Sequence, residues 1–374
     1  MAPSAVQMVR GPATVQVIGR CHVLGMDVSL RTIEVRAGKA LPFELDADCK
    51  LDVQGGESWI AGADNAGTCM WQEIAENILA LGSAAATTVV VMVVGATDTG
   101  KSTFSTYLAN LALGRGIVPC IVDGDIGQGD LAPPTALGAA VIKEQVVDLR
   151  DAQAGLFEFV GAITPAGAEK LVAQKLKSLV GRMKKTMMMT TTATPAAASL
   201  KIVNTDGYSD PLYKWMLASV VSPDVVICMG QDSSNNNNDL ARALLSRWEL
   251  FVAPSSSAQV LKTHSERVGR RMEQYIRHVG DGLVSKSTDA ARFFYRNRPI
   301  PRNAVLALGP EGMFVALGSR RRIAGFGVIE SMDAHQVSIR TGVQDFSTIH
   351  ASEIRLRKNH EERITFFSSQ ARGP

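Results

Sequence analysis

The feature that most constrains this chain is the run from Gly95 to Ser102, which reads Gly-Ala-Thr-Asp-Thr-Gly-Lys-Ser. It has the spacing G-x-x-x-x-G-K-[ST], follows an unbroken apolar stretch at 89–94, and precedes helix-forming residues. A strand, a glycine-rich turn and a helix in this order form a phosphate-binding loop, because backbone N–H groups and the helix N-terminus converge on an anion. The run predicts a nucleotide-binding α/β domain.

This loop, known as Walker A, contains side chains suited to a nucleoside triphosphate. Lys101 is expected to reach the β- and γ-phosphates, and the Ser102 hydroxyl to hold Mg²⁺. The cofactors predicted from the loop are therefore ATP, GTP or another nucleoside triphosphate, together with Mg²⁺. The predicted nucleotide-binding residues are Gly95, Ala96, Thr97, Asp98, Thr99, Gly100, Lys101, Ser102 and Thr103.

Strand-like and helix-like segments alternate around this loop, which is typical of a doubly wound parallel sheet. Thr164-Pro165 resembles an N-cap with a first-turn proline, and predicts a helix running towards Lys185. The predicted strands are 89–94, 117–122, 200–203, 225–229 and 250–252, and the predicted helices also include 69–83, 102–113 and 265–275.

Short alternating runs flank this region on both sides. Residues 13–18, 32–35 and 49–53 predict an N-terminal β domain, and 313–317, 323–329 and 337–339 a C-terminal one. The predicted domains are residues 1–68, a P-loop domain at 69–290, and a basic β domain at 291–374. Thr186–Ala198 and Ser233–Asn238 are low in complexity and predict mobile surface loops or insertions.

Composition excludes several classes of protein. Apolar residues make up 46% of the 374 residues and charged residues 20%, as in ordinary globular proteins. Five scattered cysteines without a C-x-x-C pair argue against a disulfide framework or structural zinc, and no signal-peptide pattern opens the chain. The uncharged stretch Asn77–Thr97 is interrupted by glycine, serine and threonine, so we expect no membrane span. These features predict a soluble, cytoplasmic protein.

The net charge of +3 is unevenly distributed. Residues 1–90 hold six basic and ten acidic side chains, a balance of −4, whereas 291–374 hold thirteen and seven, a balance of +6. A basic C-terminal part suggests an anionic partner such as nucleic acid, although arginine-rich domains also occur without one. The six histidines show no metal-ligand spacing.

A second polar element is the run from Asp123 to Asp130, which reads Asp-Gly-Asp-Ile-Gly-Gln-Gly-Asp. Asp123 and Asp125 lie two residues apart at the end of a predicted strand, where ligands bind in parallel sheets. One carboxylate could order the Mg²⁺ shell while another accepts a proton from an attacking hydroxyl. The alternative is a polar turn, since Asp and Gly dominate turns.

Two further elements have both functional and structural interpretations. The strand 201–204 runs into Thr205-Asp-Gly-Tyr208, where Tyr208 could stack on a nucleobase or be an ordinary half-buried tyrosine. Arg267 and Arg271 share one face of the predicted helix 265–275. They could clamp a transferring phosphoryl group from a mobile helix, or belong to a solvated face.

Together, in this order, these elements resemble the archaeal polynucleotide 5′-hydroxyl kinases, relatives of the kinase subunit of the eukaryotic pre-mRNA cleavage complex. The resemblance spans nearly the whole chain. Its most specific part is Asp123-Gly-Asp-Ile-Gly-Gln128, followed by Pro133-Pro-Thr135, which matches the family's D-x-D-x-G-Q signature. Asn204–Tyr208 falls where the family has its clasp, with tyrosine in place of the usual tryptophan.

The resemblance implies a role for each matching position. Lys101 and Asp125 would be catalytic, the first on the γ-phosphate and the second as the base for the 5′-hydroxyl. The lid arginines Arg267 and Arg271 would also be catalytic, by neutralising transition-state charge. The residues implied at the metal are Ser102, Asp123, Asp125 and Gln128, and those implied at the terminal nucleotide are Gln128, Thr205 and Tyr208.

The sequence thus predicts a kinase that transfers the γ-phosphate of ATP or another nucleoside triphosphate to the 5′-hydroxyl of RNA, with DNA as a further acceptor. An alternative is an ATP-binding scaffold of an RNA-processing complex that lacks catalysis. A third interpretation, a P-loop GTPase involved in metal insertion, lacks its N-K-x-D motif and a histidine-rich segment here.

Overall fold

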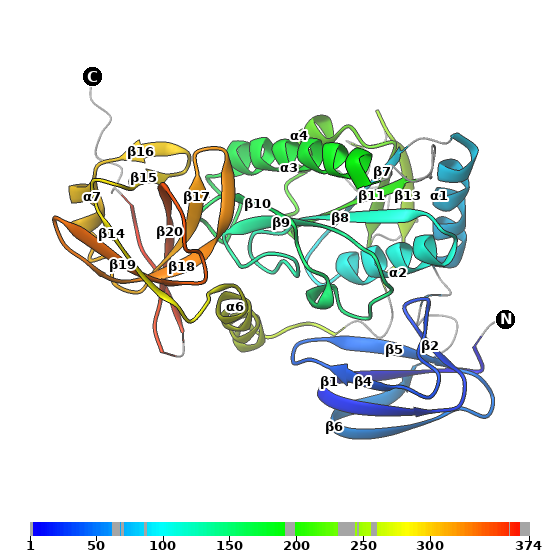
Figure 1. Cartoon of the computed structure of the whole chain (residues 1–374). Helices are drawn as coiled ribbons and strands as arrows, with labels where there is room; N and C mark the ends of the chain where they lie inside the picture. Colours follow the sequence, from blue (N-terminus) through cyan, green and yellow to red (C-terminus); the bar gives the residue numbers. More distant parts are fainter. Residues whose placement is uncertain are drawn as a thin grey trace.

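The computed structural model describes residues 3–61, 68, 71–85, 88–190, 199–230, 244, 247–255, 260–358 and 360–366. Within these residues the strands form three sheets that follow one another along the chain. Figure 1 shows the first sheet in blue, the central sheet in cyan and green, and the last in yellow to red. The predicted class, an α/β P-loop fold between two β-rich regions, is confirmed.

The N-terminal sheet is antiparallel and has the order β3-β2-β5-β1-β4, with β6 also paired to β1. One face of β1 and β5 is buried, so apolar and polar residues alternate along much of their length. Its strands are β1 (Ala5–Ile18), β2 (Cys21–Val23), β3 (Met26–Asp27), β4 (Thr32–Val35), β5 (Ala40–Leu45) and β6 (Lys50–Ala61).

The central sheet has the order β10-β9-β8-β11-β7-β12-β13. The five strands from β8 to β13 in this order are parallel, whereas β9 and β10 continue the sheet antiparallel beyond β8. The strands are β7 (Thr88–Gly95), β8 (Val118–Gly124), β9 (Ala136–Val141), β10 (Leu156–Phe159), β11 (Ser199–Thr205), β12 (Val225–Met229) and β13 (Glu249–Ala253).

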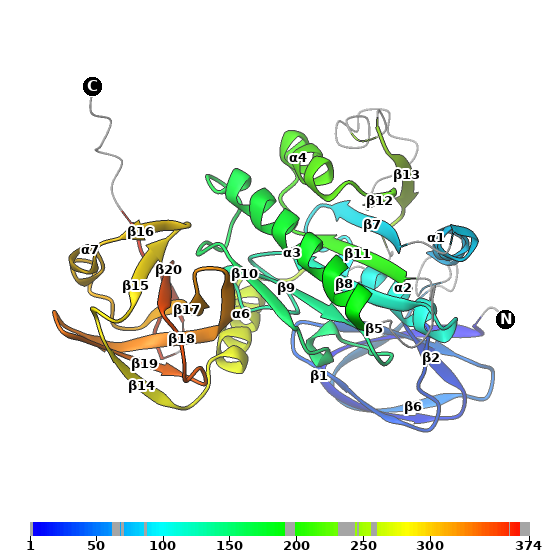
Figure 2. The same cartoon turned by 45° about the horizontal axis from the view of Figure 1, so that its top comes forward.

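Helices cover both faces of this sheet, which is why its central strands are continuous apolar runs. Helices α3 and α4 pack on one face, while α1 and α2 lie on the other together with the N-terminal sheet (Figures 1 and 2). The helices are α1 (Gln72–Ala85), α2 (Lys101–Gly114), α3 (Glu169–Thr190), α4 (Pro211–Val221) and the short 3-10 helix η2 (Leu149–Asp151).

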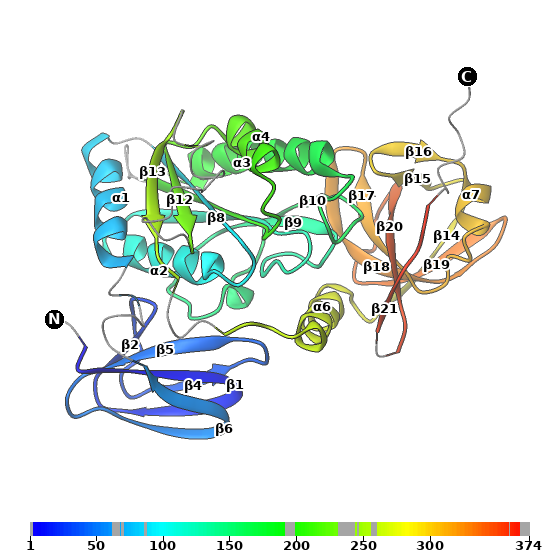
Figure 3. The same cartoon turned by 180° about the vertical axis from the view of Figure 1, so that it is seen from behind.

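Helix α6 (His264–His278) connects the central sheet to the C-terminal sheet and lies between the two outer sheets (Figure 3). The C-terminal sheet has the order β14-β19-β18-β17-β20-β15-β16, with β21 paired to β20. Its elements are β14 (Leu283–Ser287), β15 (Arg292–Tyr295), β16 (Arg298–Ile300), α7 (Arg302–Leu306), β17 (Met313–Ser319), β18 (Arg322–Met332), β19 (Gln336–Thr341), β20 (Thr348–Leu356) and β21 (Glu361–Arg363).

Several predicted boundaries differ from the structure. The helix expected from Thr164-Pro165 begins only at Glu169, because Gly167 has a left-handed backbone (φ 74°) that a helix cannot contain. Helix α3 continues to Thr190, so the first part of the predicted loop Thr186–Ala198 is helical. The C-terminal sheet begins at Leu283 rather than at 291. The domain division itself stays a prediction.

Some predictions fall on segments for which the structure gives no description. Residues 191–198, the end of the first low-complexity run, and Ser233–Asn238, the second, lie outside the described residues. Across the described part of the chain, no helix combines the length and the apolar character that a membrane crossing requires.

Candidate active site

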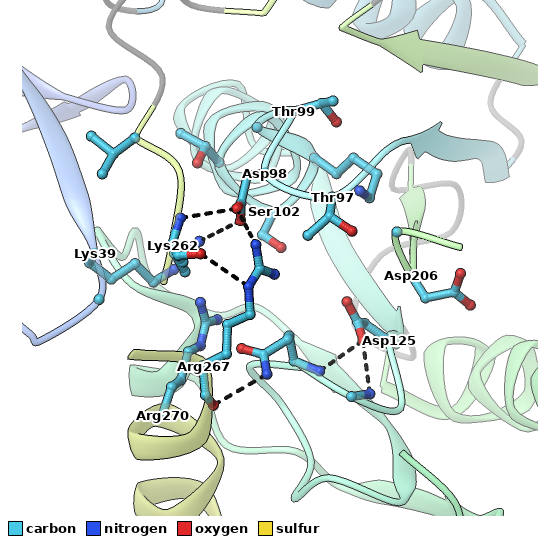
Figure 4. A pocket seen from close by; sticks show the side chains of 18 of the residues that line it. Lys39, Thr97, Asp98, Thr99, Ser102, Asp125, Asp206, Lys262, Arg267 and Arg270 are labelled. Carbon is cyan, nitrogen blue, oxygen red and sulfur yellow. Dashed lines mark hydrogen bonds and ion pairs between the residues drawn. The ribbon is translucent and has the colours of Figure 1, made fainter. Parts of the chain in front are cut away.

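A cavity of about 480 Å³ lies at the carboxyl edge of the central sheet. Its walls include the Walker A loop after β7, the loops after β8, β10 and β11, and α6. The N-terminal β region adds a further wall through Met8, Lys39 and Pro42, which no sequence pattern indicated. Figure 4 shows Asp98, Ser102, Asp125 and Arg267 facing one another across this cavity.

The Walker A loop leads directly into the first turn of α2 at the cavity, and the N-cap residue of this helix provides no side-chain cap. Gly100 is the N-cap residue and has φ 93°, a left-handed backbone that glycine adopts without steric cost. Because Gly100 has no side chain that could accept hydrogen bonds from the first N–H groups of α2, these donors are available to an anion. Residues 97–103 of the loop line the cavity, whereas Gly95 and Ala96 are not part of its lining.

Lys101 is buried beside the backbone of the Walker A loop. Its ammonium group donates a 2.6 Å hydrogen bond to the carbonyl oxygen of Ala96, and its side chain lines the cavity. Burial lowers the pKa of Lys101 to about 8, although the negative charge of Asp125 acts in the opposite direction. The ammonium group therefore lies against the backbone of the Walker A loop, at the cavity.

The two carboxylates of the loop after β8 have different surroundings. Asp123 is 1% exposed and lies behind the cavity wall, where its oxygens accept hydrogen bonds from the backbone N–H groups of Asp130 (2.6 Å) and Leu131 (3.2 Å). Burial and the nearby charges of Asp130 and Asp125 raise the pKa of Asp123 to about 7. Asp125 instead lines the cavity.

The Asp125 carboxylate is held through one of its oxygens. Oδ1 accepts hydrogen bonds from the backbone N–H groups of Gly127 (2.9 Å) and Gln128 (2.8 Å), drawn as dashed lines in Figure 4. No hydrogen bond to Oδ2 is found among the described residues. The carboxylate is therefore fixed in orientation while one oxygen is available to a proton donor in the cavity.

Asn204, at the end of β11, joins two of the predicted metal-site residues. Its Nδ2 group donates to Ser102 Oγ (3.1 Å) and to Asp123 Oδ1 (3.2 Å). Asn204 belongs to the run 204–208 that resembles the family's clasp, but the resemblance implies no role for it. Its position directly after an apolar strand, at the same edge as Asp123, is the signal that could have found it.

These residues offer a suitable site for Mg²⁺. Asn204 Oδ1 and Gln128 Oε1 are buried, and neither has a hydrogen-bond partner within the described residues. Together with Ser102 Oγ and the carboxylates, they form a set of oxygen atoms, the ligands that Mg²⁺ prefers. No cluster of three or more His, Cys, Asp or Glu side chains that could hold a metal occurs among the described residues.

Residues 205–208 are called the clasp from here on. A buried ion pair holds them against α4. Lys214 of α4 is fully buried and donates to Asp206 Oδ1 (2.8 Å), while Tyr213 donates its hydroxyl to Asp206 Oδ2 (2.7 Å). Thr205 lines the cavity, but its hydroxyl donates to the Val93 carbonyl (2.9 Å) in the sheet. Tyr208 is half-buried, lines the cavity and meets Tyr213 edge-on at 5.5 Å.

The predicted lid arginines both line the cavity, and both are paired with carboxylates from other elements. Arg267 donates to Asp98 Oδ2 (2.5 Å) and to the Lys262 carbonyl (3.2 Å). Arg271 pairs with Glu361 of β21, through its Nε at 2.5 Å. Helix α6 begins with a capping box between Thr263 and Glu266, which fixes where the two arginines emerge.

Between these arginines, Arg270 belongs to a buried charge network that sequence reasoning missed. It pairs with Asp130, which also contacts Lys39 at 3.5 Å. Lys39 in turn contacts Asp148 at 3.4 Å, and Arg150 pairs with Asp148 at 2.8 Å. The network joins the N-terminal sheet, the loop after β8 and α6, which are far apart in sequence.

The cavity brings together most of the residues predicted from sequence. Those that line it are Lys101, Ser102, Asp125, Gln128, Thr205, Tyr208, Arg267 and Arg271. Asp123 stands behind the wall, in contact with Asn204. The individual catalytic roles stay predictions, because geometry alone assigns proximity and not turnover.

Comparison with known proteins identifies the central part of the chain. Residues 95–278 match the family model described as the mRNA cleavage and polyadenylation factor CLP1 P-loop. Over these residues, just under half of the chain, the protein is similar to the CLP1 P-loop family, and we refer to them as the CLP1-type domain. The match starts at the first glycine of the Walker A loop and ends with the last residue of α6, so this CLP1-type domain includes the lid arginines.

Curated relatives of the CLP1-type domain include proteins from archaea and animals. The polyribonucleotide 5′-hydroxyl-kinase of Pyrococcus abyssi is 28% identical over 198 residues, covering 52% of this chain and 51% of the relative. The CLP1 homolog of Anopheles gambiae is 30% identical over 192 residues, covering 50% and 44%. The chain spans about half the length of the curated relatives it matches.

A solved structure of Clp1p in complex with Pcf11p shares the fold over almost the whole chain. The TM-score is 0.75 at 12% sequence identity, covering 95% of this chain and 96% of that one. The likeness therefore extends to both outer sheets as well as the CLP1-type domain.

Proposed function

We propose that this chain is a polynucleotide 5′-hydroxyl kinase. It transfers the γ-phosphate of ATP or another nucleoside triphosphate to the 5′-hydroxyl of RNA, with DNA as a second acceptor to be tested, in the presence of Mg²⁺. The names of the Pyrococcus and Xenopus relatives, which are polyribonucleotide 5′-hydroxyl-kinases, support the proposal. A cytoplasmic location remains part of the proposal, resting on the scattered cysteines of the sequence.

One observation carries the proposal: a phosphate-binding loop, an oriented carboxylate and a lid arginine line the same cavity. The loop accommodates the donor, and Asp125 presents one oxygen without a partner in the described structure. Arg267 reaches into the space between them (Figure 4).

In the proposed reaction the 5′-hydroxyl oxygen attacks the γ-phosphorus, and the bond from that phosphorus to the β–γ bridging oxygen breaks. Asp125 takes the hydroxyl proton, and the nucleoside diphosphate leaves with the electron pair of the broken bond. Lys101 and Arg267 balance the negative charge that spreads over the γ-phosphoryl oxygens. Thr205 and Tyr208 are placed to border the acceptor end.

When bound, Mg²⁺ would supply charge neutralisation between the β- and γ-phosphates. Ser102, Asp123, Asp125 and Gln128 are the residues that would hold it or its waters. Asn204 orients two of them through its amide group.

The proposal is tested by transfer of labelled γ-phosphate from ATP or GTP to RNA and DNA oligonucleotides with 5′-hydroxyl ends. An oligonucleotide with a 5′-phosphate is the acceptor control, and Asp125→Ala tests the base. Asp345→Asn is the matched protein control, since Asp345 is a fully exposed carboxylate in the loop between β19 and β20.

Label on the 5′-hydroxyl RNA with wild type and with D345N, and its loss with D125A, is the expected result. Tight nucleotide binding with unlabelled acceptors would instead favour the scaffold. Nucleotide hydrolysis without transfer would favour a P-loop NTPase. Full activity of D125A would leave a kinase whose base is another residue.

A further inference from the structure

Asp98, in the middle of the Walker A loop, turns its side chain toward α6 and the segment before it. Its Oδ1 accepts a 3.1 Å hydrogen bond from the ammonium group of Lys262. Its Oδ2 accepts from the backbone N–H of Lys262 (3.1 Å) and from the guanidinium group of Arg267 (2.5 Å). The Asp98 side chain is 5% exposed, so these contacts are shielded from water.

The backbone at Asp98 is unusual for a residue with a side chain. Its φ of 62° lies in the left-handed region, which is sterically unfavourable for an L-residue other than glycine and which Asp and Asn tolerate best. A residue held in this region at a ligand-binding loop indicates that its side chain has a function there. In this structure the side chain of Asp98 contacts Lys262 and Arg267.

Arg267 is held from two sides by these contacts. Its Nε donates to the Lys262 carbonyl (3.2 Å) and one terminal nitrogen to Asp98, while Gln128 Nε2 donates to the Arg267 carbonyl (3.3 Å). The guanidinium group still borders the cavity beside Ser102 (Figure 4). Its position over the phosphate loop is therefore set by contacts within the protein.

The surrounding charges explain why a carboxylate is needed at this position. Lys262, Arg267, Arg270 and Lys101 all border the cavity, so they repel one another in the absence of a bound phosphate. Burial would raise the pKa of Asp98, but the charges and hydrogen bonds of Lys262 and the charge of Arg267 hold it below its ordinary value. The carboxylate is thus ionised and attracts both cations.

We infer that Asp98 is a positioning residue that anchors α6 to the Walker A loop and aims Arg267 at the transferring phosphoryl group. This inference rests on the proposed kinase function for its catalytic consequence, but not for the anchoring itself. Asp98 acts through Arg267 and needs no contact with either substrate.

The substitution Asp98→Asn tests this role with little disturbance of the loop. Asparagine accepts the left-handed backbone as readily as aspartate, so the loop conformation is preserved while the charge is lost. We expect kcat to fall about tenfold, because an oriented charged contact is lost in the transition state, and the KM for the nucleotide to change less than threefold.

A double-mutant cycle tests whether the loss of kcat in D98N depends on Arg267. If Asp98 acts through Arg267, D98N lowers kcat in the wild-type background but has no further effect in an Arg267→Gln background. Asp345→Asn, which removes an exposed carboxylate paired with Lys286, is the matched control and is expected to leave kcat unchanged. Equal losses in both backgrounds, or a rise in KM with kcat unchanged, would overturn the inference.

A measurement that does not need catalysis separates the two proposals. Hydrogen–deuterium exchange of the unliganded chain is expected to speed up severalfold at 260–268 in D98N, and to stay unchanged in D345N. If wild type transfers no phosphate but this change appears, the kinase proposal fails and the anchor stands. Unchanged exchange at 260–268 in D98N would reject the anchor whatever the activity.

Discussion

The Asn204 amide group lies between the Ser102 hydroxyl and the Asp123 carboxylate, two groups that would help to hold Mg²⁺. Asn204 is 2% exposed, and its Nδ2 reaches both Ser102 and Asp123. Removing the amide therefore frees both groups from a common donor. Residues that orient metal ligands in this way typically change metal affinity by about 10–100-fold when they are replaced.

We predict that Asn204→Ala raises the Mg²⁺ concentration needed for half-maximal phosphoryl transfer at least about tenfold. The matched control is Asn110→Ala. Asn110 is also fully buried and joins the Leu24 and Val146 carbonyls by two 2.8 Å hydrogen bonds, and it is absent from the cavity lining. N110A should lose about 2 kcal/mol of stability with an unchanged Mg²⁺ requirement. Equal Mg²⁺ dependence in both variants would contradict the role given to Asn204.

His350 makes the stability of the C-terminal sheet dependent on pH. Its ring is 9% exposed and stacks on Phe294 at 5.2 Å, with Nε2 3.2 Å from Thr348 Oγ1. Burial, helped by the positive charge of Lys175 and opposed by Glu158, lowers the pKa of His350 to about 4. Between pH 6.5 and 4 the unfolded chain therefore binds a proton that the folded chain does not, and stability falls as pH falls.

We predict that lowering the pH from 7.5 to 5 reduces the free energy of unfolding of wild type by about 2 kcal/mol more than that of His350→Gln, because only wild type has the His350 imidazole. The measurement is urea unfolding of both proteins at the two pH values. His335→Gln, at an exposed turn of the same sheet, should behave like wild type. A wild-type loss no larger than that of H350Q would show that His350 does not carry the effect.

At the scale of elements, the clasp packs directly on the Walker A loop. A Cβ atom added to Gly207 would lie 2.2 Å from Thr97 Oγ1 and within 2.9 Å of the Thr97 Cα and N atoms. The backbone of the loop would have to move to make room. The predicted acceptor site and donor site are therefore in contact through two backbones.

We predict that Gly207→Ala weakens ATP binding at least about tenfold and destabilises the fold by about 1–3 kcal/mol, because Thr97 cannot move without displacing the loop. Titration calorimetry and thermal unfolding measure the two effects. Gly181→Ala in α3 is the control: a Cβ there meets nothing within 4 Å, so it should stabilise the helix by about 0.5–1 kcal/mol. Unaltered ATP affinity in G207A would contradict this prediction and would show that the Walker A loop accommodates the added Cβ atom.

The sequence predicted the elements whose signals are local. The Walker A loop, the Asp123–Gln128 run and the valine-rich strands were all predicted because spacing and apolar runs mark them. The antiparallel strand β9 was missed, since Ala-Leu-Gly-Ala-Ala-Val has small residues with no strand-like alternation. The Thr205 hydroxyl, predicted at the substrate, is bonded to Val93 on the neighbouring strand, a contact that depends on strand order.

The rest of the site depends on contacts between distant parts of the chain, which no local pattern records. Lys39 of the N-terminal sheet reaches Asp130, and Glu361 of the C-terminal sheet reaches Arg271. Such pairs form only after the sheets have docked. A single sequence gives the charges but not the partners.

At the scale of the whole molecule, α6 is the element that all three sheets share. Glu266 pairs with Arg10 of the N-terminal sheet, and Arg271 with Glu361 of the C-terminal sheet. Tyr275, fully buried, packs its ring 4.8 Å from that of Phe314. The helix that carries the lid arginines is thus docked at both of its ends.

We predict that Glu361→Gln destabilises the chain by about 3 kcal/mol, because it leaves the mostly buried Arg271 without its counter-charge. Thermal unfolding measures the loss. Glu362→Gln changes the adjacent residue, which forms a surface pair with Arg357, and should cost less than about 1 kcal/mol. Replacing Arg271 and Glu361 together by methionine should cost less than E361Q alone. Similar stability of E361Q and E362Q would refute this account.

The wall that the N-terminal sheet adds to the cavity has a consequence for inhibitor design. A compound confined to the Walker A loop would meet backbone groups that every P-loop protein presents, and would discriminate poorly among them. Met8, Ala40 and Pro42 border the same cavity, yet no phosphate-binding motif fixes their identity. A ligand that extends from the loop to this apolar rim would gain selectivity from side chains outside the motif.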